Sequence, residues 1–101
     1  MLVVRNVFQL KFGKAREALT VMKEGVAIQK RALAGTEFST RLLTDVTGEF
    51  YTLVFELMVP NLATYEGLAP KLFADKAWQA NYEKMVPLVE SGQRDIFTVV
   101  E

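Results

Sequence analysis

Two stretches of the chain alternate in a way that leaves both of their faces apolar, and this pattern limits the possible folds more than any other feature. In residues 2–11 and 49–59, the side chains at alternate positions share one face, and most of them are apolar, as in strands that pack on a core. Several side chains on the second face are apolar too. A sheet that faces water on one side normally carries polar residues there. The chain therefore needs a cover for both faces of its sheet.

Helical periodicity and turn residues separate these strands from further elements. The predicted elements are strand 2–11, helix 14–33, strands 37–45 and 49–59, short helix 62–69, helix 76–90 and strand 94–100. Asn61 and Asp75 are the expected N-caps of the two later helices. Pro87 is expected to kink or end the last helix, with Ser91-Gly92 after it. The β-α-β-β-α-β order within 101 residues predicts one domain, residues 1–101, with an α+β ferredoxin-like fold and an antiparallel sheet.

The alternation assigns the strand residues to two faces of this sheet. The face toward the helices is expected to hold Val4, Phe8, Leu10, Phe38, Leu42, Tyr51, Leu53, Phe55, Leu57, Phe97 and Val99. The opposite face is expected to hold Val3, Arg5, Val7, Gln9, Ser39, Arg41, Leu43, Phe50, Thr52, Val54, Glu56, Ile96, Thr98 and Val100. About eight of these opposite-face side chains are apolar, a patch of the kind that marks an interface. We therefore expect a homodimer joined through this face; the alternative is a monomer with scattered surface valines and isoleucines.

Charged residues on the same face need partners if a second subunit covers them. With the last strand beside the first, followed by the third and the second, Arg5 and Glu56 lie on adjacent strands and Arg41 lies nearby. A buried charge is costly unless it is paired. The sequence thus predicts an Arg–Glu network in the dimer core, which we interpret as structural rather than catalytic.

Composition excludes several classes of function. The chain has no cysteine and no histidine, which excludes disulfides, thiolate nucleophiles, the Ser-His-Asp triad, the usual zinc sites and a His-ligated haem. Twelve basic and twelve acidic residues balance, so the basic surplus of a nucleic-acid binder is missing. The carboxylates are dispersed, and we expect no metal and no cofactor. No apolar run is long enough for a bilayer and no signal-peptide pattern begins the chain, so we expect a cytoplasmic protein without a membrane partner.

Three segments resemble a known superfamily. They are VVRNVFQLKFGKAREALTVMKE (residues 3–24), FYTLVFELMVPNLATYEGL (50–68) and WQANYEKMVPLVESGQRDIFTVVE (78–101). The first two resemble the opening strand–Gly–helix and the third strand of the dimeric α+β barrel superfamily, and the last is similar to NIPSNAP-like and antibiotic-biosynthesis-monooxygenase-like members. The resemblance implies an eight-stranded barrel built from two subunits, with a ligand pocket between the helices and the sheet of each subunit.

Asn6 is the sharpest candidate for chemistry, because it is a polar amide among helix-facing apolar residues and needs hydrogen-bond partners. Its position seven residues before Gly13 is similar to the strand asparagine of haem-degrading barrel enzymes. Those enzymes also use a histidine, which this chain lacks. The alternative is an asparagine satisfied by a helix backbone or by water.

Aromatic residues complete the predicted pocket. Trp78 and Tyr82, four residues apart on one helix, could clamp a planar ligand, and Tyr51 could supply a phenol nearby. Met22 is added to the predicted ligand-binding set, although filling the core is its simplest role. All of these side chains are also compatible with ordinary core packing.

These residues support three functions of different kinds. The first is a NIPSNAP-like dimeric barrel of unassigned activity that binds a small apolar or aromatic molecule. The second is a cofactor-independent monooxygenase for an aromatic or polyketide-type substrate, in which the substrate supplies the electrons to oxygen and Asn6 is the candidate catalytic residue. The third is a purely structural or assembly module. The residues alone do not establish whether the protein is an enzyme.

Overall fold

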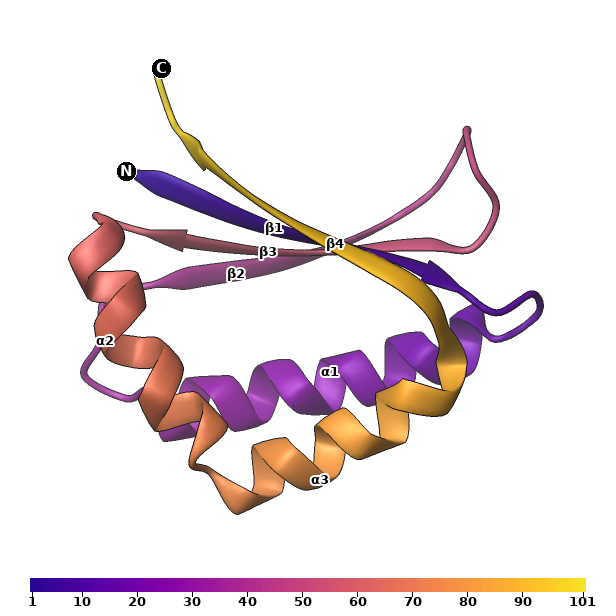
Figure 1. The fold of residues 1–101 in the computed structure, drawn as a ribbon, viewed down its shortest axis with the longest axis horizontal. Coiled ribbons are helices and arrows are strands. Elements are labelled where there is room, and N and C mark those ends of the chain that lie inside the picture. The colour runs from indigo at the N-terminus through magenta and orange to yellow at the C-terminus, as the bar shows by residue number, and fades with distance from the viewer.

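Four antiparallel strands form one sheet in the order β2-β3-β1-β4, with helices along a single face (Figure 1). The computed structural model describes all residues from 1 to 101. The elements are β1 (Leu2–Leu10), α1 (Ala15–Ala32), β2 (Ser39–Thr44), β3 (Thr52–Val59), α2 (Leu62–Phe73), α3 (Lys76–Met85), a 3-10 turn (Val86–Leu88) and β4 (Val89–Thr98). The predicted α+β ferredoxin-like fold and strand order are confirmed.

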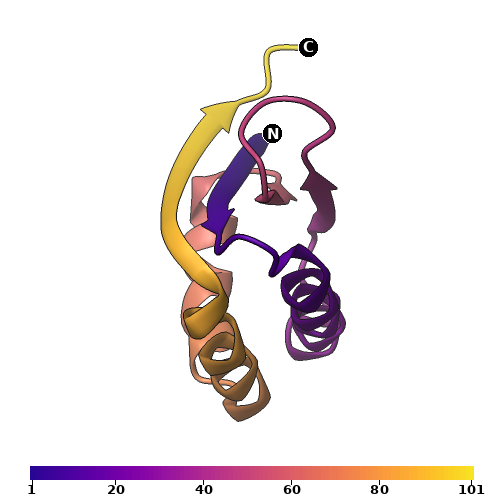
Figure 2. The ribbon, with the colours of Figure 1, turned by 90° about the vertical axis from the view of Figure 1, so that its right-hand side faces the viewer.

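The hydrophobic core lies between the sheet and the helices. Val4, Leu53 and Val59 of the central strands are almost fully buried there, as are Ala18 of α1 and Leu33 just after it. Figure 2 shows the layers end-on, with α1 and α3 side by side beneath the sheet and the opposite face of the sheet uncovered. No helix combines the length and the apolar content needed to span a bilayer.

Both predicted N-caps are confirmed. The Asn61 side chain accepts a hydrogen bond from the Thr64 backbone N–H at 2.9 Å. The Asp75 carboxylate accepts one from the Trp78 backbone N–H at 3.0 Å. Each cap satisfies an N–H that a helix start leaves without a partner, so these two residues fix where α2 and α3 begin.

Strand β4 corrects two expectations. The prediction continued the last helix to residue 90 and began the strand at 94, but Pro87 ends the regular helix, and β4 begins at Val89. Gly92 therefore lies inside the strand, opposite Phe8. The alternation of β4 is also inverted: Ile96 pairs with the buried Val4 on the helix side, whereas Phe97 pairs with Val3 on the opposite face.

The loop of the β2–β3 hairpin and helix α2 are both longer than predicted. Strand β3 begins at Thr52 rather than at 49, because Tyr51 adopts a left-handed backbone conformation with a φ of 60°. The Asp45 carboxylate accepts a hydrogen bond from the Thr52 N–H at 2.9 Å and closes the wider loop. Helix α2 continues past Pro70 because Leu72, one turn after Leu68, is buried.

The uncovered face, which we call the outer face, carries the predicted Arg–Glu network. Glu56 is 5% exposed and lies 2.9 Å from the Arg5 Nε and 2.7 Å from the Arg41 Nε. Around this network lie Val3, Val7, Leu43, Val54, Met58, Phe97 and Val99. The outer face thus carries an ion-paired cluster surrounded by apolar side chains. The β4 residues on this face are Phe97 and Val99, not the predicted Ile96, Thr98 and Val100.

Candidate functional site

A close contact between α1 and α3 forms the roof of the candidate site. Gly25 of α1 has no side chain, and a Cβ at this position would lie 2.8 Å from the Asn81 Oδ1 of α3. The buried Asn81 amide donates a hydrogen bond to the Val21 carbonyl at 2.9 Å. This small residue opposite a bonded amide lets the two helices approach each other and fixes the face that α3 turns toward the sheet.

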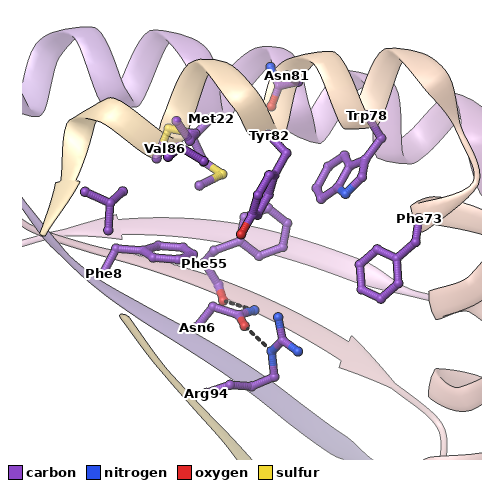
Figure 3. Close-up of a pocket in the computed structure, with 12 residues that line it drawn as sticks. Asn6, Phe8, Met22, Phe55, Phe73, Trp78, Asn81, Tyr82, Val86 and Arg94 are labelled. Atoms are coloured by element: carbon purple, nitrogen blue, oxygen red, sulfur yellow. Dashed lines mark hydrogen bonds between the residues drawn. The ribbon is translucent and has the colours of Figure 1, made fainter. Parts of the chain in front are cut away.

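Beneath this roof lies a cavity of about 170 Å³ that is open on one side. Its floor comes from β1, β3 and β4, and its roof and end wall come from α1, α3 and the end of α2 (Figure 3). The lining residues are Asn6, Phe8, Met22, Phe55, Phe73, Trp78, Asn81, Tyr82, Met85, Val86, Val89 and Arg94. Apolar cavities of about 150 Å³ take up a benzene ring, so this space suits one ring of a ligand.

The floor has a clear cause in the sequence of β4. Gly92 lies opposite Phe8, and a Cβ at Gly92 would lie 3.2 Å from the Phe8 ring. The absent side chain lets the ring lie against β4 and form part of the apolar floor. The Ser-Gly pair that reads as a helix terminator in the sequence therefore shapes the cavity instead.

Polar groups gather at one side of the cavity. The Arg94 Nε donates a hydrogen bond to the Asn6 Oδ1 at 2.6 Å, and the Asn6 amide N–H donates to the Phe55 carbonyl at 3.3 Å. In Figure 3 the Tyr82 hydroxyl points from α3 down toward this pair. Tyr82 is 64% exposed, so it stands at the edge of the cavity. The site combines an apolar interior with a polar, solvent-accessible edge, the usual composition of a small-molecule pocket.

Asp75 positions the tryptophan of the site. Its carboxylate bonds to the Trp78 backbone N–H and lies 3.5 Å from the Arg31 Nη2. The Trp78 hydrogen bond, and secondarily the Arg31 charge, hold the pKa of the Asp75 carboxyl below its ordinary value. The start of α3 is thereby anchored with a charged cap, and Trp78 follows one turn later over the cavity.

Four of the five predicted ligand-binding residues, Asn6, Met22, Trp78 and Tyr82, line this cavity. Tyr51 does not line it. This residue lies in the hairpin loop just before β3, where its ring stands edge-on to Phe12 with centroids 4.7 Å apart, and it borders a separate hollow.

Sequence reasoning missed Arg94 and did not assign Asn81 to the site. Arg94 was assigned to neither face in the prediction, and the inverted alternation of β4 would put it, like Ile96, on the outer face. Asn6 of β1 pairs directly with Arg94 of β4. A strand prediction that began at Val89 would have placed these two residues side by side.

A second hollow of about 60 Å³ adjoins the first beneath α2. It shares Asn6, Phe55, Phe73, Trp78 and Arg94 with the larger cavity. Asn6 and Arg94 thus stand between two apolar spaces. No group of three or more acidic side chains comes together anywhere in the structure to form a metal site.

Comparison with known proteins supports the fold. No protein-family model matches the sequence, and no curated protein matches it significantly. Among solved structures, a NIPSNAP domain protein from Burkholderia xenovorans superposes with a TM-score of 0.86 at 24% identity, covering 99% of this chain and 95% of that one. A NIPSNAP family protein of unknown function from Agrobacterium tumefaciens gives 0.83 at 24% identity, with 96% and 86% covered.

Oxygenases with the same fold are more distant. SnoaB, a cofactor-independent oxygenase from Streptomyces nogalater, superposes with a TM-score of 0.73 at 15% identity, covering 99% of this chain and 93% of that one. The protein therefore has the fold shared by NIPSNAP domain proteins and antibiotic-biosynthesis-monooxygenase-like oxygenases, and its structural neighbours come from both groups.

Proposed function

We propose that the protein is a NIPSNAP-like binding protein that holds a small apolar or aromatic molecule in the cavity between α3 and the sheet. The observation that carries this proposal is the open cavity of about 170 Å³, whose walls are largely apolar and whose one charged group, Arg94, lies beside Asn6 on the sheet side. Burial of a ring against Phe8, Phe55 and Met85 supplies the affinity, since apolar area removed from water contributes about 25 cal/mol per Å². The polar edge then orients the part of the ligand that remains in water.

Fluorescence tests this proposal directly, because Trp78 is the only tryptophan of the chain and lines the cavity. Titration with neutral ring compounds, such as toluene and phenylacetamide, is expected to change its emission in a saturable way. Val86 is 56% exposed at the edge of the cavity, so Val86→Phe is expected to narrow the entrance without unfolding the protein and to weaken binding.

The matched control is Val46→Phe, which places the same ring on a hairpin-loop residue that is 96% exposed. This variant is expected to bind like the wild type. Absence of saturable binding by any ring compound would refute the proposed function, as would equal binding by the Val86→Phe variant.

We further propose that the protein acts as a homodimer joined through the outer face. No helix covers the outer face within one subunit (Figure 2). The support for the dimer is that apolar side chains surround the Glu56 network on this face, and Phe97 among them is 49% exposed. Each such side chain gains up to about 1.5–3 kcal/mol when fully buried. Two outer faces packed together would form the barrel that the sequence resemblance implies.

Sedimentation analysis tests the dimer. The wild type is expected to sediment with the mass of two subunits, and Phe97→Lys is expected to sediment as one subunit with unchanged circular dichroism. Val46→Lys introduces the same charge in the hairpin loop and is expected to remain dimeric. A wild-type mass of one subunit would remove this proposal. We propose the cytoplasm as the location, which fractionation of the producing cells would test.

A second candidate function is cofactor-independent oxygenation of an electron-rich aromatic substrate. The observation in its favour is that Asn6, Trp78 and Tyr82 meet at one cavity in a fold that SnoaB shares. In such a reaction a quinol and O₂ give a hydroxyquinone and water: one oxygen atom enters a ring C–H bond, the other leaves as water, and the substrate supplies all the electrons. Oxygen uptake with a panel of quinol-type substrates tests it. Lost turnover in a folded Asn6→Ala variant supports the role of Asn6, and unchanged turnover contradicts it.

A further inference from the structure

At the cavity, the free groups of Trp78 and Arg94 can only donate hydrogen bonds, the Tyr82 hydroxyl can donate or accept, and the Asn81 Oδ1 lies against Gly25 of α1. Asn6 uses its amide oxygen for Arg94 and its amide N–H for the Phe55 carbonyl. The Trp78 indole N–H, the Tyr82 hydroxyl and the terminal nitrogens of Arg94 make no hydrogen bond within the chain. A ligand that completes these bonds must therefore present acceptors.

The charge at the cavity points the same way. Arg5, Arg31 and Arg41 each have a carboxylate within 3.5 Å, but Arg94 forms no ion pair in the chain. None of the residues that line the cavity is acidic. The site thus carries one positive charge that the protein itself does not neutralise.

Asn6 holds this charge in place. The bond of 2.6 Å between the Arg94 Nε and the Asn6 Oδ1 fixes one edge of the guanidinium, and Asn6 is itself tied to β3 through the Phe55 carbonyl. Figure 3 shows the guanidinium directed toward the space between Tyr82 and Phe73, where the two hollows meet. Its two terminal nitrogens are left with the fork geometry that matches the two oxygens of a carboxylate.

We infer that the ligand is a small monocarboxylate with one ring or an apolar body of similar size, and that Arg94 binds its carboxylate while the ring enters the cavity. This inference rests on the proposed binding function and names its ligand class. One cation matches one carboxylate charge, and the floor of Phe8 and Phe55 takes the apolar part. Asn6 is then a positioning residue that orients Arg94.

Paired probes separate charge from shape. Phenylacetate and phenylacetamide share ring and size, but only the first is charged at neutral pH. Titrations followed by Trp78 fluorescence are expected to show phenylacetate binding about tenfold more tightly, which corresponds to about 1.4 kcal/mol. Arg94→Gln is expected to lower the preference to less than about threefold, because it weakens phenylacetate binding more than phenylacetamide binding. Arg94 is exposed, so this variant is expected to fold.

Arg16→Gln is the matched control, because Arg16 is another exposed arginine without an ion pair and lies away from the cavity. It is expected to retain the full preference. Equal binding of the two probes to the wild type, or a preference retained in Arg94→Gln, overturns the inference while the binding function stands. If neither probe nor any neutral ring binds, both fail together.

Discussion

Replacing Gly25 by alanine is expected to destabilise the protein, although alanine is the better helix former. Gly25 lies within α1, where glycine is unfavourable by about 1 kcal/mol relative to alanine. An added Cβ, however, would lie 2.8 Å from the Asn81 Oδ1 and 3.5 Å from the Trp78 ring. The first of these distances is shorter than a carbon–oxygen van der Waals contact allows, so either the Asn81 side chain or the whole of α3 must move.

The expected magnitude follows from what this movement disrupts. Crowding of a packed contact costs about 1–3 kcal/mol. Displacement of Asn81 also breaks its buried hydrogen bond to the Val21 carbonyl, which adds about 1 kcal/mol. The gain in helix propensity offsets about 1 kcal/mol. The free energy of unfolding should therefore fall by about 1–3 kcal/mol.

A double-mutant cycle monitored by urea denaturation isolates the cause. In an Asn81→Ala background the obstructing oxygen is gone, so Gly25→Ala should become neutral or stabilising by up to about 1 kcal/mol. Gly67 of α2 is the matched control, because nothing lies within 4 Å of its Cβ position. Gly67→Ala is expected to stabilise the wild type.

An equal loss of stability from Gly25→Ala in both backgrounds would contradict the proposed clash with Asn81. A stabilising effect of Gly25→Ala in the wild type would contradict it as well. Either result would mean that Asn81 is not the residue that requires glycine at this position.

Two further predictions concern charged residues. Glu56→Gln removes the counter-charge of Arg5 and Arg41 and is expected to lower the free energy of unfolding by about 1–2 kcal/mol in urea; an unchanged midpoint would contradict a structural role. The hydrogen bond from Trp78 holds the pKa of the Asp75 carboxyl below its ordinary 3.8. Its charged form therefore stabilises the fold above that pH, and this contribution is lost as the pH falls below it. Asp75→Asn keeps a capping oxygen but cannot titrate, so thermal midpoints should fall less steeply with acid than in the wild type; identical slopes would contradict this.

The sequence predicted the strands best where the alternation is long and one face is strictly apolar. Leu53, Phe55 and Leu57 of β3 recur at every second position, and their burial was predicted correctly. In β4, by contrast, Ile96 and Phe97 are adjacent and both apolar, so a short window cannot say which of them faces the helices. Only the pairing of Val4 with Ile96 decides this.

The error in β4 also explains what was missed at the site. Ser91-Gly92 reads as a break, so the predicted strand begins at 94 rather than at Val89 and its alternation is inverted. That alternation gives no reason to place Arg94 beside Asn6. Asn6 itself could be predicted because it interrupts an otherwise apolar face of β1. The Gly25–Asn81 contact needed the spatial crossing of two helices, which no local pattern contains.

Arg5 and Asn6 are consecutive residues of β1 and therefore point to opposite faces of the same sheet. Arg5 meets Glu56 outside, and Asn6 orients Arg94 within the cavity. One peptide unit joins the two contacts, so any movement of β1 that displaces Arg5 also displaces Asn6. If the proposed dimer shifts β1 when it forms, the proposed ligand site shifts with it, and the apparent dissociation constant of the ligand then varies with protein concentration.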